Sequence, residues 1–172
     1  MPEVDIDRAF RDGDLAALGT ATGDPPGFPN CELPWDLCGG HVLQLAIYHS
    51  PIAFIRRLLE LGCDPNYRAD DGFTSLIAAI DRKLPDRLEL IQLLAMSGAD
   101  IGQRGVNDFT PVHHAVVKGD RAAVELLLTL GADPSLRTRI DHYETPREMA
   151  ERRKQTDLTV LLRAAEEHVR RR

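Results

Sequence analysis

One phrase recurs along the sequence at a nearly constant interval, and this repetition limits the possible folds more than any other feature. A leucine-rich run is followed by glycine and, two residues later, by aspartate, and the glycines Gly62, Gly98 and Gly131 lie 36 and 33 residues apart. The three segments are LLELGCDPN (58–66), LLAMSGADI (93–101) and LLLTLGADP (126–134). A fixed period of about 20 to 50 residues is typical of chains whose units stack side by side into a solenoid. The sequence therefore predicts a repeat protein.

A second phrase precedes each helical run and shows where the repeats differ in length. It reads HVLQLAI (41–47), TSLIAAI (74–80), TPVHHAV (110–116) and TPREMAE (145–151), with starts 33, 36 and 35 residues apart. Both 36-residue intervals contain residues 74–98, so three additional residues lie there, and we place them at 82–85, between two helices. Two more fall in the loop 136–142. Insertions confined to turns leave the stacking of the helices intact.

Each unit reads as two short helices followed by a loop. In the third unit Thr110 is suited to cap a helix and Pro111 to its first turn, where the missing N–H is not needed. Gly119 interrupts the helical run, Gly131 suits the left-handed residue that ends the second helix, and Pro134 prevents its continuation. Helices of two to three turns are marginal in isolation, so the units need neighbours to cover their apolar faces.

The third unit resembles an ankyrin repeat. The period is near 33, and the matching residues occur in the family's order: Thr110, Pro111, His113, Ala115, Gly119, Gly131, Ala132 and Asp133. The resemblance covers residues 35–165, although HVLQ (41–44) replaces the usual opening of one unit and TPREMA (145–150) keeps only part of it. It implies an all-α solenoid of about four repeats in a small stand-alone protein. We expect one domain, with a shortened cap unit and a Pro-rich loop at 1–34 and repeats at 35–67, 68–103, 104–138 and 139–172, the last a C-terminal cap.

The expected core follows from the same register. Small side chains at Ala46, Ala79 and Ala115 let the first helices approach closely, and paired leucines fill the space between layers. These are Leu58, Leu59, Leu93, Leu94, Leu127 and Leu128. His113 occupies the position at which the family's imidazole ties neighbouring turns together, which favours a structural role over catalysis.

The resemblance also implies where a partner protein binds, because ankyrin repeats use their β-turn fingers and the exposed faces of their inner helices. Aromatic anchors flanked by arginines are the composition expected of a protein-binding surface. Phe73 and Phe109 can equally pack on adjacent fingers, and Trp35 can plug a groove behind the Pro-rich loop 24–35, itself a candidate binding loop. The expected partner-binding residues are Trp35, Tyr48, His49, Arg68, Asp70, Phe73, Asp81, Arg82, Arg104, Val106, Phe109, Val117, Lys118, Asp141, Glu144, Arg152 and Arg153.

Charge and composition exclude several other classes of protein. The net charge of -6 provides no general attraction for nucleic acid. Residues 1–40 carry eight acidic against two basic side chains, and residues 147–172 carry eight basic against five acidic, ending in three arginines that can attract an acidic partner or simply be solvated. The N-terminal segment is charged where a signal peptide is apolar, and no window reaches the ~20 apolar residues of a membrane span. We expect a cytoplasmic location and no membrane contact.

No catalytic motif or cofactor-binding motif is present, so we expect a protein-binding module that is not an enzyme, needs no cofactor and is a monomer when unbound. A narrower hypothesis is an immunity or antitoxin-like inhibitor of a toxic enzyme, which suits a short acidic binder. A different class is a metal- or ligand-binding protein built on Cys31, Cys38, His41 and His49, although this spacing matches zinc sites poorly. Self-assembly through the acidic head and basic tail is a further alternative. Together with Cys63, Cys31 and Cys38 make an odd number of cysteines without paired spacing, which favours free thiols in a reducing compartment.

Overall fold

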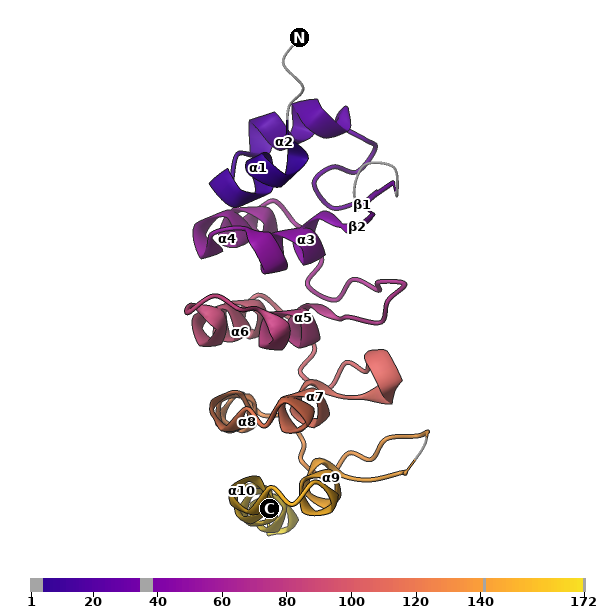
Figure 1. Ribbon diagram of the computed structural model, residues 1–172, viewed down its shortest axis with the longest axis vertical. Coiled ribbons are helices and arrows are strands. Elements are labelled where there is room, and N and C mark those ends of the chain that lie inside the picture. The colour runs from indigo at the N-terminus through magenta and orange to yellow at the C-terminus, as the bar shows by residue number, and fades with distance from the viewer. Residues whose placement is uncertain (1–4, 35–38, 141, 172) are drawn as a thin grey trace. The chain divides into compact units, whose positions relative to one another are not determined.

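The protein is described here from a computed structural model, which covers residues 5–34, 39–140 and 142–171. Short helices alternate with loops along these residues, which confirms the predicted all-α repeat fold (Figure 1). The chain divides into two compact units, Met1–Ala99 and Asp100–Arg172.

The described residues of the first unit form three pairs of helices. The pairs are α1 (Ile6–Asp12) with α2 (Leu15–Thr22), α3 (Val42–His49) with α4 (Ile52–Glu60), and α5 (Ser75–Asp81) with α6 (Arg87–Met96). The first helix of each pair also packs on the first helix of the next, so that α1 contacts α3 and α3 contacts α5. We call these inner helices, because in this unit α3 and α5 lie between the loops and the outer helices α4 and α6 (Figure 1).

The cap pair begins and ends as its sequence dictates. The Asp5 carboxylate accepts a hydrogen bond from the Arg8 backbone N–H at the start of α1, and Asp14 accepts one from Ala17 at the start of α2. Gly13 ends α1 with φ +67°, a left-handed conformation that glycine adopts without strain. The shortened N-terminal unit expected from the sequence is therefore a complete pair of capped helices.

The Pro-rich segment ends in a small strand pair that the sequence did not reveal. The strand β1 (Glu32–Leu33) pairs antiparallel with β2 (Gly40–His41), and β2 leads directly into α3. Two residues per strand are too few to produce a recognisable alternation of polar and apolar side chains. The ladder is fixed by backbone pairing, which leaves little trace in the sequence.

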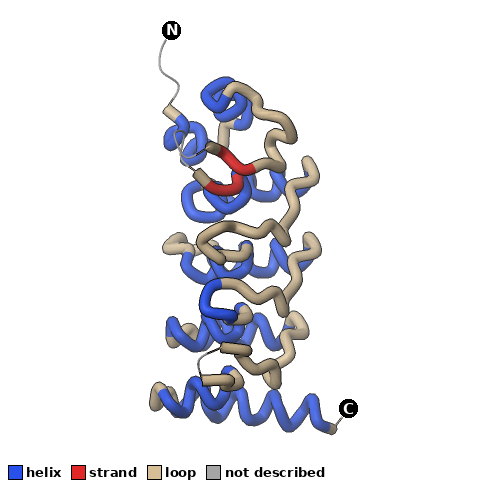
Figure 2. Tube along the Cα trace, turned by 90° about the vertical axis from the view of Figure 1, so that its right-hand side faces the viewer, coloured by secondary structure: helices blue, strands red, loops and turns tan. Residues whose placement is uncertain are grey.

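The second unit contains a one-turn 3₁₀ helix, η1 (Val106–Asp108), and two pairs of helices. The pairs are α7 (Pro111–Lys118) with α8 (Arg121–Thr129), and α9 (Pro146–Arg152) with α10 (Thr156–Arg170). The inner helices of this unit, α7 and α9, pack on each other, and its loops project from the side of the inner helices (Figures 1 and 2). Gly119 ends α7 with φ +67° and Gly131 has φ +97°, as the sequence predicted.

The core is made by the residues that the repeat register selected. Ala46, Ala79 and Ala115 are fully buried, and so are Leu58, Leu94 and Leu127. Leu59 and Leu128 are only half-buried, which corrects the expectation that both leucines of each pair fill the interior. Adjacent residues on a helix are about 100° apart, so when one of a pair points directly inward the other lies at the edge of the buried stripe.

His113 ties two turns together in the second unit, as predicted from its position. Its Nε2 lies 3.1 Å from the Glu144 carbonyl oxygen and its Nδ1 lies 2.8 Å from the Thr110 hydroxyl. Because a carbonyl can only accept, Nε2 carries the hydrogen and Nδ1 accepts from Thr110. Burial of the ring lowers the pKa of His113, so the folded protein holds the neutral imidazole.

Replacing His113 tests this arrangement. His113→Ala should cost about 2–4 kcal/mol of unfolding free energy at pH 7.5, through the lost side-chain volume and the unpaired Glu144 carbonyl. The wild type should also lose stability as the pH falls below about 6.5, because the unfolded chain then takes up a proton at His113 that the folded chain resists. Denaturant unfolding at pH 7.5 and 5.5 measures both effects.

The alanine variant should lose less stability than the wild type between these two pH values. His168→Ala, which removes an exposed imidazole from α10, is the control and should keep the wild-type pH response. An equal pH response in His113→Ala and the wild type would contradict the assigned role.

Candidate functional site

The first unit contains a pocket of about 220 Å³ beside the inner helix α3. Two residues expected at the binding surface, Tyr48 on α3 and Asp70 on the following loop, both line it. We call the loop 61–74 the first finger. The other lining residues come from β1, from β2 and the residue before it, from α3 and from this finger, namely Glu32, Gly39, Gly40, Gln44, Leu45, Ala69 and Asp71.

The first finger is fastened to α3 by Asp71. One carboxylate oxygen accepts from the backbone N–H of Phe73, which closes the turn within the finger, at 2.8 Å. The other accepts from Gln44 Nε2, also at 2.8 Å, across 27 residues of sequence. The position of the pocket wall is therefore fixed by hydrogen bonds to both the backbone of the finger and the helix.

His41 makes a second attachment at the base of the same finger. Its Nε2 lies 3.1 Å from the Arg68 carbonyl oxygen, which can only accept, so Nε2 is the donor. The His41 ring stacks on Tyr67, with centroids 4.9 Å apart and planes inclined by 25°. These contacts anchor the finger at two points, so Arg68 and Asp70 are exposed on a loop whose base is held in place.

Tyr48 lies in an acidic environment. Burial raises the pKa of its hydroxyl, and the negative charges of Asp81 and Asp71 raise it further. The phenol is therefore neutral at physiological pH, with a hydroxyl able to donate and an aromatic ring half-exposed.

The remaining expected residues of this unit lie outside the pocket lining. His49 is exposed next to Tyr48, with ring centroids 6.2 Å apart, while Phe73 and Asp81 are half-buried. Trp35 lies outside the described residues, so its expected role stays a prediction.

Arg82 corrects the sequence-based expectation, because it is buried and not exposed on the inner helix. Its guanidinium donates to the carbonyl oxygens of Ile47 and Ser50 at the end of α3, and forms a two-point ion pair with Asp86. The helix α5 ends at Asp81, so Arg82 begins the turn, and its side chain folds back on α3. It satisfies helix-end carbonyls that have no partner within the helix, and it is not available to a binding protein.

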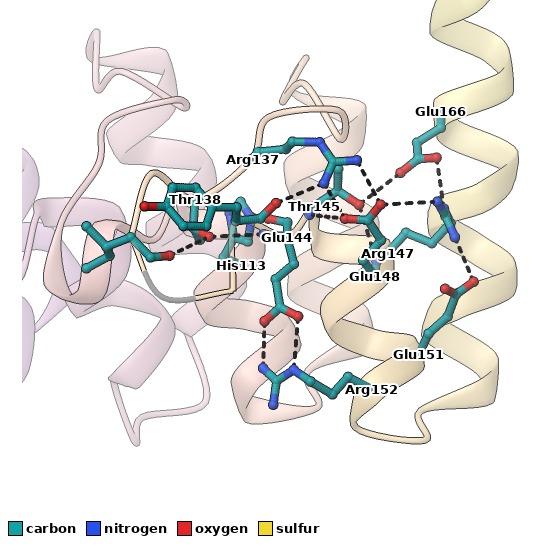
Figure 3. Close-up of polar contacts among 12 residues, drawn as sticks. His113, Arg137, Thr138, Glu144, Thr145, Arg147, Glu148, Glu151, Arg152 and Glu166 are labelled. Carbon is teal, nitrogen blue, oxygen red and sulfur yellow. Dashed lines mark hydrogen bonds and ion pairs between the residues drawn. The ribbon is translucent and has the colours of Figure 1, made fainter.

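The second unit holds three of its expected charged residues, Arg104, Glu144 and Arg152, in ion pairs within itself. Figure 3 shows the pair of Glu144 and Arg152. Glu144 is buried and accepts from Arg152 at 2.6 and 2.9 Å, and this pairing lowers the pKa of Glu144. Arg137 pairs with Glu148 at 2.6 and 2.8 Å and lowers its pKa in the same way. Glu144 was expected to face a partner, but it is enclosed by its own unit.

Arg104 and Phe109 are also engaged within the second unit. Arg104 donates to Asp108 at 2.9 Å and to the Arg137 carbonyl oxygen at 2.8 Å. The Phe109 ring stacks on His113, with centroids 6.0 Å apart and planes inclined by 14°. Of the two roles considered for Phe109, the packing role is the one these contacts support.

The other expected residues of this unit lie nearer the surface. Val106 in η1 and Val117 on α7 are half-buried, and Lys118 and Arg153 are exposed. Arg153 donates to the Val117 carbonyl oxygen at 3.2 Å. Asp141 lies outside the described residues.

Sequence reasoning missed Gln44, Asp71 and Glu32 as members of the pocket. A signal existed for two of them. Gln44 stands at the position of its repeat that His113 occupies in a later one, where a side chain reaches the next turn, and Asp71 precedes a glycine in a turn. Glu32 approaches through the short strand pair, which the sequence did not show.

The proposed metal cluster finds no support in the part of the chain that is described, where no three His, Cys, Asp or Glu side chains are grouped to hold a metal ion. Cys63 is buried and donates to the Pro29 carbonyl oxygen, and burial together with Cys31 raises its pKa to about 12. A thiol with this pKa stays protonated and is a poor metal ligand. Cys38 lies outside the described residues. Among the described helices, none is both long and apolar enough to cross a bilayer.

Comparison with known proteins identifies the repeats. The profile of the family described as ankyrin repeats (three copies) matches residues 43–138. Human SH3 and multiple ankyrin repeat domains protein 2 is 34% identical over 89 residues, which are 51% of this chain and 5% of that protein. Human BCL-6 corepressor-like protein 1 is 36% identical over 75 residues, 44% of this chain and 4% of that protein. A probable serine/threonine-protein kinase of Dictyostelium discoideum is 27% identical over 109 residues, 62% of this chain and 13% of that protein. The chain thus spans about an eighth or less of the length of these relatives.

The buried position of Arg82 leads to a testable stability difference. Arg82→Met should lower the unfolding free energy by about 3 kcal/mol, because the carboxylate of Asp86 and two carbonyl oxygens lose their donor. Lys83→Met changes an exposed cation in the same turn and should change stability by less than about 0.5 kcal/mol. Thermal or denaturant unfolding of both variants makes the comparison, and equal stabilities would show that Arg82 has no structural role.

Proposed function

The chain belongs to the ankyrin-repeat family, and on this basis we propose that it acts by binding another protein through the fingers and inner helices of its repeats. Ankyrin repeats are generally protein-interaction modules, and the family is typically non-catalytic. The relatives are many times longer than this chain. The activities in their names therefore apply to those proteins and are not assigned to this chain.

One observation carries the proposal: a pocket lies between an inner helix and a finger, and both Tyr48 and Asp70 line it. Arg68 and His49 are exposed on the same two elements. We call Tyr48, His49, Arg68 and Asp70 the first binding face. Its side chains combine an aromatic ring with charges of both signs, the mixture that favours protein over small-molecule partners.

The second unit contributes less to the proposed binding. Arg104, Glu144 and Arg152 form ion pairs within the unit, and using them for a partner would first break those pairs. Val106, Phe109, Val117, Lys118 and Arg153 remain candidate contacts there. Asp81 and Phe73 in the first unit are candidates that lie beside the first binding face, and Trp35 and Asp141 stay predictions.

The narrower hypotheses differ in their support. Inhibition of a toxic enzyme stays a prediction, because no feature of the described residues bears on the identity of the partner. The cytoplasmic location, the monomeric unbound state and self-assembly through the charged ends also stay predictions. Metal binding is not proposed, since the described residues offer no ligand cluster.

Partner capture tests the proposed function. The immobilised full chain should retain at least one protein from an extract of its native cells, and Tyr48→Ala/Arg68→Ala/Asp70→Ala should reduce that retention at least about tenfold, equivalent to 1.4 kcal/mol. Quantitative mass spectrometry of the retained proteins measures the change.

Arg56→Ser/Gln92→Ser is the matched control, because both residues are exposed on the outer helices α4 and α6. It should retain the partner at the wild-type level, and circular dichroism should give all three proteins the same melting temperature within a few degrees. Equal retention by the wild type and the triple variant would exclude the first binding face as the site.

A further inference from the structure

The pocket beside Tyr48 has a size that suits one side chain. Its volume is about 220 Å³, several times the roughly 30 Å³ that one water occupies in the liquid. Sites for small-molecule ligands are usually larger, about 300–1,000 Å³. A single long side chain inserted from another protein is therefore the guest that this volume favours.

The lining of the pocket combines apolar surface with carboxylates. Leu45, Ala69 and the phenol of Tyr48 supply apolar and aromatic wall, while Asp70 and Asp71 supply negative charge. Glu32 adds a third carboxylate, and the lining residues that the structure describes include no lysine or arginine. An apolar wall with a carboxylate end matches a side chain that has an aliphatic stem and a cationic head.

The two aspartates have different capacities for a guest. Asp71 already accepts from Phe73 and Gln44, but a carboxylate has about four lone-pair positions, so each oxygen can accept again. Asp70 is exposed and forms no hydrogen bond or ion pair with any described residue. The pocket therefore holds one carboxylate that is fixed in place and one that is uncompensated.

The surrounding charges add to this preference. Asp81 and Asp71 both lie close enough to Tyr48 to raise the pKa of its hydroxyl, in addition to the larger effect of burial. The basic groups near the pocket on the packed elements are His41, Arg68, His49 and Arg82, and none of them is among its described lining residues. His41 Nε2 donates to the Arg68 carbonyl, the His49 ring centroid lies 6.2 Å from that of Tyr48, and Arg82 is paired with Asp86. The region thus favours a cation. The carboxylates are not grouped as metal ligands among the described residues, which favours an organic cation.

We propose that this pocket receives an arginine side chain of the partner protein, with its stem along Leu45 and Ala69 and its guanidinium between Tyr48 and the two aspartates. This inference rests on the proposed protein-binding function and specifies the chemistry that the partner presents. Arginine fits better than lysine because its planar head stacks on an aromatic ring and donates to two carboxylates at once, whereas an ammonium is a compact point charge.

A peptide titration tests the assignment without knowledge of the partner. The ¹⁵N-labelled full chain is titrated with acetyl-Gly-Gly-Arg-Gly-Gly-amide and with peptides carrying citrulline or lysine at the central position. The arginine peptide should shift amide resonances of residues 44–48 and 68–73 with a millimolar dissociation constant. The citrulline peptide, which has the same shape without the charge, should bind at least about tenfold more weakly, and the lysine peptide should lie between them.

Variants of the pocket residues test where the arginine side chain of the peptide binds. Asp70→Asn and Tyr48→Leu should each weaken binding of the arginine peptide at least about fivefold, and Glu60→Gln, which removes an exposed charge from α4 outside the pocket, should leave it unchanged. Asp71 is left intact because its carboxylate closes the turn of the finger. Equal binding of the citrulline or lysine peptide, shifts centred elsewhere, or an unchanged affinity in Asp70→Asn would each overturn the proposal.

The outcome is separable from that of partner capture. If the partner is captured through the first binding face but the arginine peptide does not bind, the pocket assignment fails and the proposed function stands. If the peptide binds as expected but no protein is retained, the pocket assignment stands and the proposed function fails.

Discussion

Side-by-side packing of short helices is the interaction on which everything else in each unit depends. Apart from α10, the helices have seven to ten residues, a length at which an isolated helix is unstable in water. In the first unit, α3 is buried against α5 through positions such as Ala46 and Ala79, and fully buried leucines from the outer helices complete the layers. The loops contribute no comparable core, so their shape depends on what the helices hold in place.

Long-range hydrogen bonds from side chains to the backbone connect the loops to the packed helices. His41 and His113 each reach a carbonyl in the following finger, and Arg82 reaches back to carbonyls at the end of α3. Each bond joins groups about 30 residues apart, close to one repeat. An unpaired buried carbonyl costs about 1–3 kcal/mol, so these bonds define a finger conformation without any regular secondary structure.

The repeat phase could be read from the sequence because leucine and glycine mark the ends of three units and threonine marks the starts of three. Gly119 ends its helix and Gly131 adopts the left-handed conformation as predicted, and His113 makes the predicted hydrogen bond to the next turn. Arg82 could not be placed, because the register gives its position along the chain but not the direction of its side chain, which is set by the carbonyl oxygens of Ile47 and Ser50 and by Asp86. Only part of the pocket could be predicted from the sequence. Tyr48 and Asp70 follow from the repeat register, whereas Glu32 depends on a strand pair that backbone hydrogen bonds alone define.

The two neighbouring aspartates of the first finger differ in how much the conformation of the loop depends on them. Asp71 is held by a backbone N–H and by Gln44, so any replacement there disturbs the loop before it alters what the loop selects. Asp70 contributes charge to the same hollow without supporting the loop. In the proposed binding mode, a mutation at residue 70 therefore changes the charge presented to a partner at little cost in stability, while residue 71 stays constrained by its bonds to the finger and to α3.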